Sequence, residues 1–445
     1  MNMTKSVLMF DAQRNRRMLA LALPMILSNI TVPLLGLVDT AVIGHLSNAY
    51  YLGGVAVGST IITLIFWLLG FLRMATTGLV AQAWGANDTQ RQFQLLLQGI
   101  SLTLLLSALI LILQRPLLEL ALSMTEASAE VIRYCREYFS IRIWSTPFAL
   151  LNLVLLGYLL GRQQPKAAMW QLIIANSVNI LLDVLFVIGL GWGVKGAAMA
   201  SVIADFCAML VALTMVKRQL SLQGGFHLGE QLKRLNPAGY GQLLRLNGDI
   251  FVRSLCLQAT FAFMTFHGAS LGDDTVAANA VLLNLLLLIS YALDGIAYYA
   301  EAETGRTWGK RDMPELRNTV TLAFQWSAVS ALGFSLLFFL TGEYIIQLLT
   351  GIEAVQHLAF QYLPWLIVMP VLAFGSYLFD GVYIGTAQGK IMRNSMLFCT
   401  LMVFFPVWWS LQSWGNGALW AAMSAFMLSR SLSLGLHYRL SLSRG

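Results

Sequence analysis

Charged residues are scarce in this chain of 445 residues, because Asp, Glu, Lys and Arg together make up only 11% of it. A soluble domain carries about 25% charged residues, so a chain that is 58% hydrophobic does not fit a soluble class. The composition instead predicts an integral membrane protein in a lipid bilayer, with room for roughly ten to fourteen spans. The net charge of +7 is modest and indicates basic cytoplasmic loops rather than nucleic-acid binding.

Cysteine and the familiar catalytic motifs are also lacking. The four cysteines are scattered and form no CxxC pair, so the sequence predicts neither disulfides nor a metal site. No HExxH motif occurs, which argues against an intramembrane metalloprotease, and no cofactor is expected. A channel is disfavoured because the chain has no filter-like loop and no rings of like charge.

Long apolar segments are what the chain has in abundance. We expect twelve transmembrane helices, an all-α fold, at 18–43, 53–80, 94–114, 138–160, 168–190, 195–216, 243–267, 277–300, 319–340, 358–385, 392–412 and 417–437. The longest polar stretch, 217–242, is predicted to be a cytoplasmic linker. It would join an N-terminal six-helix bundle (1–216) to a C-terminal six-helix bundle (243–445).

Basic residues are distributed unevenly between the predicted loops. Most of them precede the first span or fall in the connections that follow even-numbered spans, for example Arg162 and Lys166. Basic loops face the cytoplasm, so both termini are predicted to be cytoplasmic.

The two predicted bundles resemble each other at a constant offset of 224 positions. This offset relates Trp84 to Trp308, Asp88 to Asp312, Gly157 to Gly381, Gly161 to Gly385 and Gly191 to Gly415. Both bundles would start in the cytoplasm, so we expect a parallel repeat whose axis runs along the membrane normal.

Two acids lie deep in the predicted spans. Asp39 is roughly 31 Å from the inner end of the first span, and Asp183 is roughly 23 Å from the inner end of the fifth. Acids in spans are costly and rare, so each is a candidate functional residue. Pro24 and Pro33 share the first span with Asp39 and are candidate hinge positions.

Polar residues accompany Asp183. Asn179 lies one helical turn before it and Asn176 lies close to the same face, while Ser201 and Asp205 lie in the next span. An Asn at this spacing could hold the carboxylate. Polar residues that only link neighbouring helices are the alternative for these positions.

The repeat assigns the deep acids to one half of the chain. Adding 224 to Asp39 gives Phe263, and adding it to Asp183 gives Val407. A cavity with one acidic and one apolar wall would suit an amphipathic, often cationic, organic compound. If a proton and that compound exclude each other at the acids, proton entry can drive export.

Together these features resemble the multidrug and toxic compound extrusion (MATE) family, and specifically its DinF branch. The resemblance rests on the twelve-span repeat, LPMILSNITVPLLGLVDTAVIGHL in the first span, WGANDTQR after the second and NSVNILLDVLF in the fifth. It implies a multidrug exporter driven by a proton or sodium gradient through rocking of two bundles. It also implies that Asp39, Asn179, Asp183 and Ser201 form the cation site, with Asn176 and Asp205 as possible additions.

Some expectations remain open between alternatives. The same carboxylates, with Asn179, could ligate sodium in place of a proton. The NorM branch of the family has deep acids in the C-terminal half, whereas Asp249 and Asp380 here lie near the cytoplasmic face. A lipid-precursor flippase of the same superfamily is the second candidate, disfavoured because deep basic residues are scarce. We expect a monomer in the bacterial inner membrane.

Overall fold

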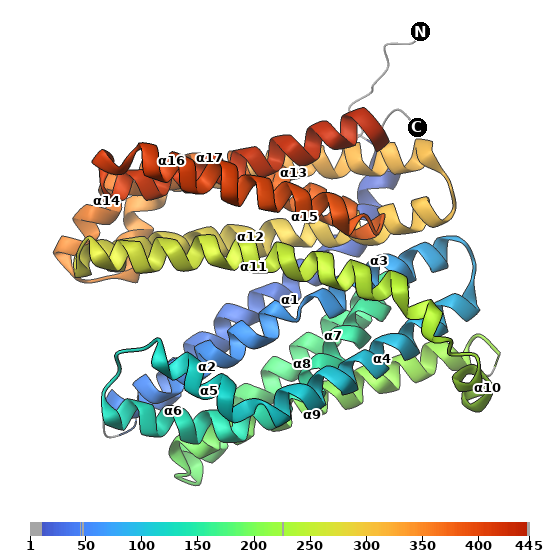
Figure 1. The fold of residues 1–445 in the computed structure, drawn as a ribbon, viewed down its shortest axis with the longest axis horizontal. Helices are drawn as coiled ribbons and strands as arrows, with labels where there is room; N and C mark the ends of the chain where they lie inside the picture. Colours follow the sequence, from blue (N-terminus) through green and yellow to red (C-terminus); the bar gives the residue numbers. More distant parts are fainter. Residues whose placement is uncertain (1–10, 45, 47–48, 225–226, 443–445) are drawn as a thin grey trace. The chain divides into compact units, whose positions relative to one another are not determined.

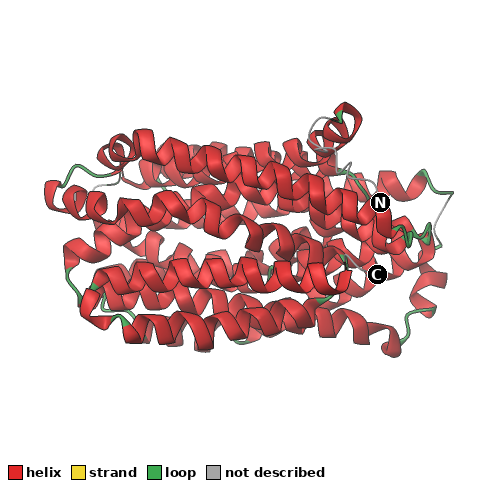
Figure 2. Cartoon of the chain, turned by 90° about the horizontal axis from the view of Figure 1, so that it is seen from above, coloured by secondary structure: helices red, strands yellow, loops and turns green. Residues whose placement is uncertain are grey.

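The computed structural model describes residues 11–44, 46, 49–224 and 227–442, without the side chains of residues 36, 37, 39, 40, 44 and 49. Within this part of the chain the regular elements are helices, and there is no strand (Figure 2). Twelve segments are long and apolar enough to cross a membrane. The predicted all-α fold with twelve transmembrane helices is therefore confirmed.

Figure 1 labels the helices in chain order. Their bounds are α1 Ala12–Gly44, α2 Ala49–Leu68, α3 Phe71–Gly85, α4 Thr89–Ile112, α5 Gln114–Ser123, α6 Ala129–Arg142, α7 Thr146–Gly161, α8 Pro165–Asp183, α9 Gly193–Ser221, α10 Leu228–Lys233, α11 Tyr240–Ser270, α12 Asp273–Gly309, α13 Met313–Leu349, α14 Glu353–Gly385, α15 Gly389–Phe398, α16 Phe405–Ser410 and α17 Asn416–His437. Short π-helical segments follow α8, α15 and α17 at Val184–Gly189, Cys399–Phe404 and Tyr438–Leu442.

The chain forms two compact units. The N-terminal unit is Leu27–Leu244, and the C-terminal unit contains Arg245 to the end together with the residues up to Ile26. In the N-terminal unit α7 packs against α3, α4, α8 and α9, and in the C-terminal unit α14 packs against α12, α13 and α17 (Figure 1). One central helix thus organises each unit.

The 224-residue repeat holds at the level of side-chain and backbone contacts. Asp88 caps α4 by accepting a hydrogen bond from the backbone of Arg91, and Asp312 caps α13 by accepting one from Glu315. The residues before these caps, Asn87 and Arg311, both have a left-handed backbone, with φ of 55° and 60°.

Equivalent glycines fit the central helices to their neighbours. A Cβ on Gly157 of α7 would lie 2.6 Å from the backbone oxygen of Arg73 on α3. A Cβ on Gly381 of α14 would lie 2.7 Å from the backbone oxygen of Ala297 on α12. Each pair of contacts is related by 224 positions, so the repeated glycines make the same close helix packing in both units.

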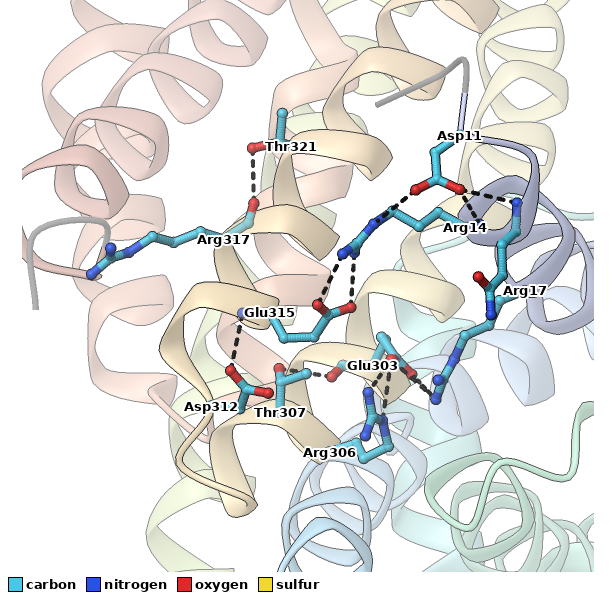
Figure 3. Close-up of polar contacts among 11 residues, drawn as sticks. Asp11, Arg14, Arg17, Glu303, Arg306, Thr307, Asp312, Glu315, Arg317 and Thr321 are labelled. Atoms are coloured by element: carbon cyan, nitrogen blue, oxygen red, sulfur yellow. Dashed lines mark hydrogen bonds and ion pairs between the residues drawn. The ribbon is translucent and has the colours of Figure 1, made fainter. Parts of the chain in front are cut away.

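Charged side chains fasten the first turns of α1 within the C-terminal unit. Arg14 donates to both carboxylate oxygens of Glu315 on α13, at 2.9 and 3.2 Å (Figure 3). Arg17 pairs at 3.2 Å with Glu303 on α12, a buried carboxylate that also accepts from Arg306 (Figure 3). Below them Met18, Ala22 and Met25 are buried at helical spacing, so a polar cluster continues into an apolar stripe.

The segment between α9 and α11 is fastened to α4. Gln94 donates to the side chain of Gln231 at 2.8 Å, and the hydroxyls of Ser101 and Tyr240 lie 2.8 Å apart. Arg91 donates to Gln242 at 3.2 Å. Since residues 91, 94 and 101 recur at helical spacing, one polar face of α4 holds the segment that was predicted as the linker 217–242. The predicted bounds of the two bundles stay a prediction.

Candidate functional site

The candidate residues Asn179 and Asp183 lie on α8 in the N-terminal unit. Both side chains are buried, with exposed fractions of 8% and 2%. Asp183 ends the regular part of α8, because the next residues form the π-helical segment Val184–Gly189. Such π-helical turns are frequent at functional sites, and this one begins directly after the buried acid.

Ser201 of α9 contacts Asn179 on α8. Its hydroxyl donates to Oδ1 of Asn179 at 3.4 Å, and the Ser201 side chain is 7% exposed. The structure therefore joins two of the four residues predicted as the principal site, from neighbouring helices. Asp183, one turn from Asn179 on α8, lies on the same side of that helix.

Asn176 contacts the first helix. Its amide donates to the hydroxyl of Thr31 on α1, and Thr31 in turn donates to the backbone oxygen of Ser28 at 2.6 Å. Asn176 thus links α8 to the part of α1 that belongs to the N-terminal unit.

The remaining predictions on α1 concern its backbone and one acid. The helix continues through Pro24 and Pro33. Asp39 lies within the helical range of α1, but its side chain falls outside the described residues. No geometry therefore links Asp39 to the α8 residues, and its role stays a prediction.

Asp205 lies one turn further along α9 than Ser201 and has a charged partner. Nη1 of Arg142, the last residue of α6, lies 2.8 Å from Oδ2 of Asp205. Asn152 of α7 donates to the backbone oxygen of Asp205 at 3.0 Å. The possible additional site residue is thus part of a separate polar network.

A second buried charge cluster lies in the C-terminal unit. Arg253 of α11 and Arg430 of α17 donate to the same carboxylate oxygen of Asp380 on α14, at 2.6 and 2.7 Å. All three side chains are less than 10% exposed. The sequence places Asp380 near the cytoplasmic face, but it holds no signal for these two arginine partners, which lie 127 and 50 positions away.

A structural metal site has no counterpart among the described residues. No group of three or more His, Cys, Asp or Glu side chains in that part of the chain could hold a metal ion. The carboxylate of Asp183 can take up a proton. Together with the amide of Asn179 and the hydroxyl of Ser201, it offers oxygen atoms of the kind that a hard cation such as sodium prefers.

Known proteins resemble this chain along most of its length. The family model described as MatE matches residues 24–185 and 250–409. The DNA damage-inducible protein F of Escherichia coli (strain K12) is 47% identical over 94% of this chain and 91% of its own length. A probable multidrug resistance protein NorM of Synechocystis sp. is 27% identical over 73% of this chain and 69% of its own length. A crystal structure of MATE in the straight conformation matches with a TM-score of 0.86 at 20% identity, over 100% of this chain and 99% of that one, which shows the shared fold.

Proposed function

This chain belongs to the MATE family of membrane transporters, and we propose that it exports amphipathic or cationic organic compounds in exchange for a cation. The observation that carries the proposal is the buried acid Asp183 within a membrane span, one turn from the hydrogen-bonded pair of Asn179 and Ser201. An acid at this position is costly, and a coupled transporter gives it a use. Names of relatives that refer to multidrug resistance or export are consistent with this class of substrate.

In the proposed mechanism, the coupling cation and the organic compound exclude each other at the same acids. A carboxylate that carries a proton or binds sodium is neutralised and no longer attracts an organic cation. When the coupling cation enters from outside, the compound therefore leaves, and the empty acid can be reloaded with substrate from inside. Asp39 and Asp183 are the proposed coupling acids, while Asn179 and Ser201 orient the ligand.

The proton is the coupling ion that we propose, with sodium as the alternative. A proton needs only a carboxylate, whereas sodium needs several oxygen ligands, which Asp39, Asn179 and Asp183 could supply. Pro24 and Pro33 are proposed as the positions where α1 bends during the exchange, because prolines are where helices kink. Both termini are proposed to face the cytoplasm, and the protein to act as a monomer in the inner membrane.

The flippase alternative requires a basic site for a phosphate group. Arg142, Arg253 and Arg430 lie in candidate spans and are each in contact with a carboxylate, so the charge of these three arginines is already engaged. This pairing favours the exporter over a carrier of phosphorylated lipid precursors.

The test is efflux of a fluorescent organic cation from proteoliposomes, with pH and sodium gradients imposed separately. Wild type is compared with Asp39→Asn and Asp183→Asn. Asp274→Asn, which changes an exposed acid in the first turn of α12, is the matched control. We expect efflux on the pH gradient alone, lost in the first two variants and retained in the control. Efflux that survives in both deep-acid variants would remove the proposed coupling site.

A further inference from the structure

Four helices of the N-terminal unit meet at one polar network. Arg142 of α6 pairs with Asp205 of α9 at 2.8 Å. Asn152 of α7 donates its amide to the backbone oxygen of Asp205 at 3.0 Å. Gln171 of α8 donates to the side-chain oxygen of Asn152 at 3.1 Å. The network therefore connects α6, α7, α8 and α9 without a gap.

This network contains an ion pair within membrane-spanning segments. The side chains of Arg142 and Asp205 are 14% and 23% exposed, and both residues lie inside candidate spans. Desolvating two charges is costly, so such pairs mark places where the charges themselves have a use. By contrast, the ion pair between Arg136 and Glu119 in the same unit is far more exposed.

The network lies one turn away from the candidate site. Asp205 follows Ser201 by four residues on α9, a distance of about 6 Å along the helix. Gln171 precedes Asn179 on α8. The two helices that share the hydrogen bond between Ser201 and Asn179 are thus tied together a second time, through Asn152 of α7.

The second tie matters because the first is weak. At 3.4 Å the bond between Ser201 and Asn179 is near the upper limit for a hydrogen bond, so a small shift of α9 would break it. The pair between Arg142 and Asp205 is shorter, at 2.8 Å, and joins α9 to α6.

Charge balance gives the network a further consequence. The guanidinium of Arg142 is a cation that belongs to the protein, and it neutralises Asp205 with no coupling ion present. Tyr138, on α6 one turn before Arg142, is the other titratable group that interacts with this guanidinium.

We propose that Arg142 sets the charge beside the cation site: its guanidinium pairs with Asp205 and withdraws that carboxylate from the set of ion ligands. This inference rests on the proposed function, because it assumes that a cation binds beside Asn179 and Ser201. It assigns a role to two charged residues that the exchange mechanism itself leaves unused.

The test uses two substitutions that change the local charge in opposite directions, so they should shift the affinity for the coupling cation in opposite directions. Arg142→Gln leaves an extra negative charge beside the site and is expected to tighten binding of the coupling cation. Asp205→Asn leaves an extra positive charge and is expected to weaken it. In the double variant the extra charge disappears and the two amides can hydrogen-bond, so its affinity should return close to that of wild type.

The measurement is the half-saturating concentration of the coupling cation in the efflux assay and in binding to purified protein. We expect shifts of about tenfold in opposite directions for the single variants, the size typical of residues that act through a network. A thermal unfolding scan accompanies each variant, because a merely structural role would lower stability in both without opposite shifts in affinity.

Several outcomes would overturn the inference. Single variants that shift the affinity in the same direction, or not at all, would contradict it. If a single variant does not fold, a double variant that folds but binds the cation at least tenfold more weakly than wild type would also contradict it. A wild-type protein without any cation dependence would instead contradict the proposed function, so the two failures are distinguishable.

Discussion

Several buried or half-buried charged side chains in this protein have partners that are distant in the sequence. Arg142 and Asp205 are 63 positions apart, and Asp380 is 127 positions from Arg253 and 50 from Arg430. An acid in an apolar run is visible in the sequence, which is why Asp183 could be singled out. An arginine partner far away in the sequence is not visible in this way, which is why Asp205 and Asp380 were assessed without their arginines.

The Asp380 cluster yields a prediction about stability. Asp380→Asn would leave Arg253 and Arg430 buried without a full counter-charge, and removing one member of a buried charge pair costs about 3–5 kcal/mol. Asp249→Asn is the matched control, because Asp249 also pairs with an arginine, Arg393, in a more exposed position. The control should cost about 1 kcal/mol or less.

Thermal unfolding of both variants in detergent checks this expectation. We expect a clearly lower melting temperature for Asp380→Asn than for Asp249→Asn. Equal melting temperatures would mean that the buried carboxylate does not hold the two arginines as the structure indicates.

At the scale of helices, hydropathy predicts the spans and misses their polar extensions. The segment predicted at 277–300 is part of α12, which runs Asp273–Gly309, and the segment at 319–340 is part of α13, which runs Met313–Leu349. The extra turns are polar, and they stay helical because caps such as Asp312 satisfy the free backbone groups. Hydropathy measures the apolar part of a span and therefore cannot locate these ends.

The polar segment between the bundles shows the same limitation. Its composition predicts a linker, but the hydrogen bonds of Gln231 and Tyr240 with α4 depend on which face of α4 is turned towards it. That face is set by packing within the N-terminal unit and leaves no signature in the linker's own sequence.

Helix packing yields a prediction based on the repeated glycines. Gly157→Ala and Gly381→Ala would each place a methyl group against a backbone oxygen, at 2.6 and 2.7 Å, so a helix must move. Overpacking of this kind costs about 1–3 kcal/mol. Gly333→Ala is the matched control, because a Cβ there meets nothing within 4 Å, and replacing a mid-helix glycine should stabilise by about 0.5–1 kcal/mol.

Melting temperatures of the three variants measure this difference. The two repeated glycines should give similar losses, since they make equivalent contacts in the two units. If only one of the two variants had a lower melting temperature, the equivalent glycine contacts would not contribute equally to the stability of the two units.

At the scale of the whole molecule, the repeat concerns the scaffold that both units share, whereas the deep acids concern the proposed chemistry of one unit. The 224-residue offset reproduces caps, left-handed turns and glycine contacts in both units, so it describes a common scaffold. The carboxylates proposed for coupling have no counterpart at that offset, because the equivalent positions are Phe263 and Val407. Scaffold and proposed chemistry could both be derived from the sequence, whereas the charge networks that stabilise them required the structure.

The central claim is that a coupling cation and an organic cation exclude each other at the acids of the N-terminal unit. The most direct measurement is release of the coupling cation when substrate binds to purified protein, followed as protons in weak buffer and as radioactive sodium. The account predicts that an added organic cation releases protons from wild type and releases none from Asp39→Asn or Asp183→Asn. Binding of the compound to wild type with no release of either ion would contradict it.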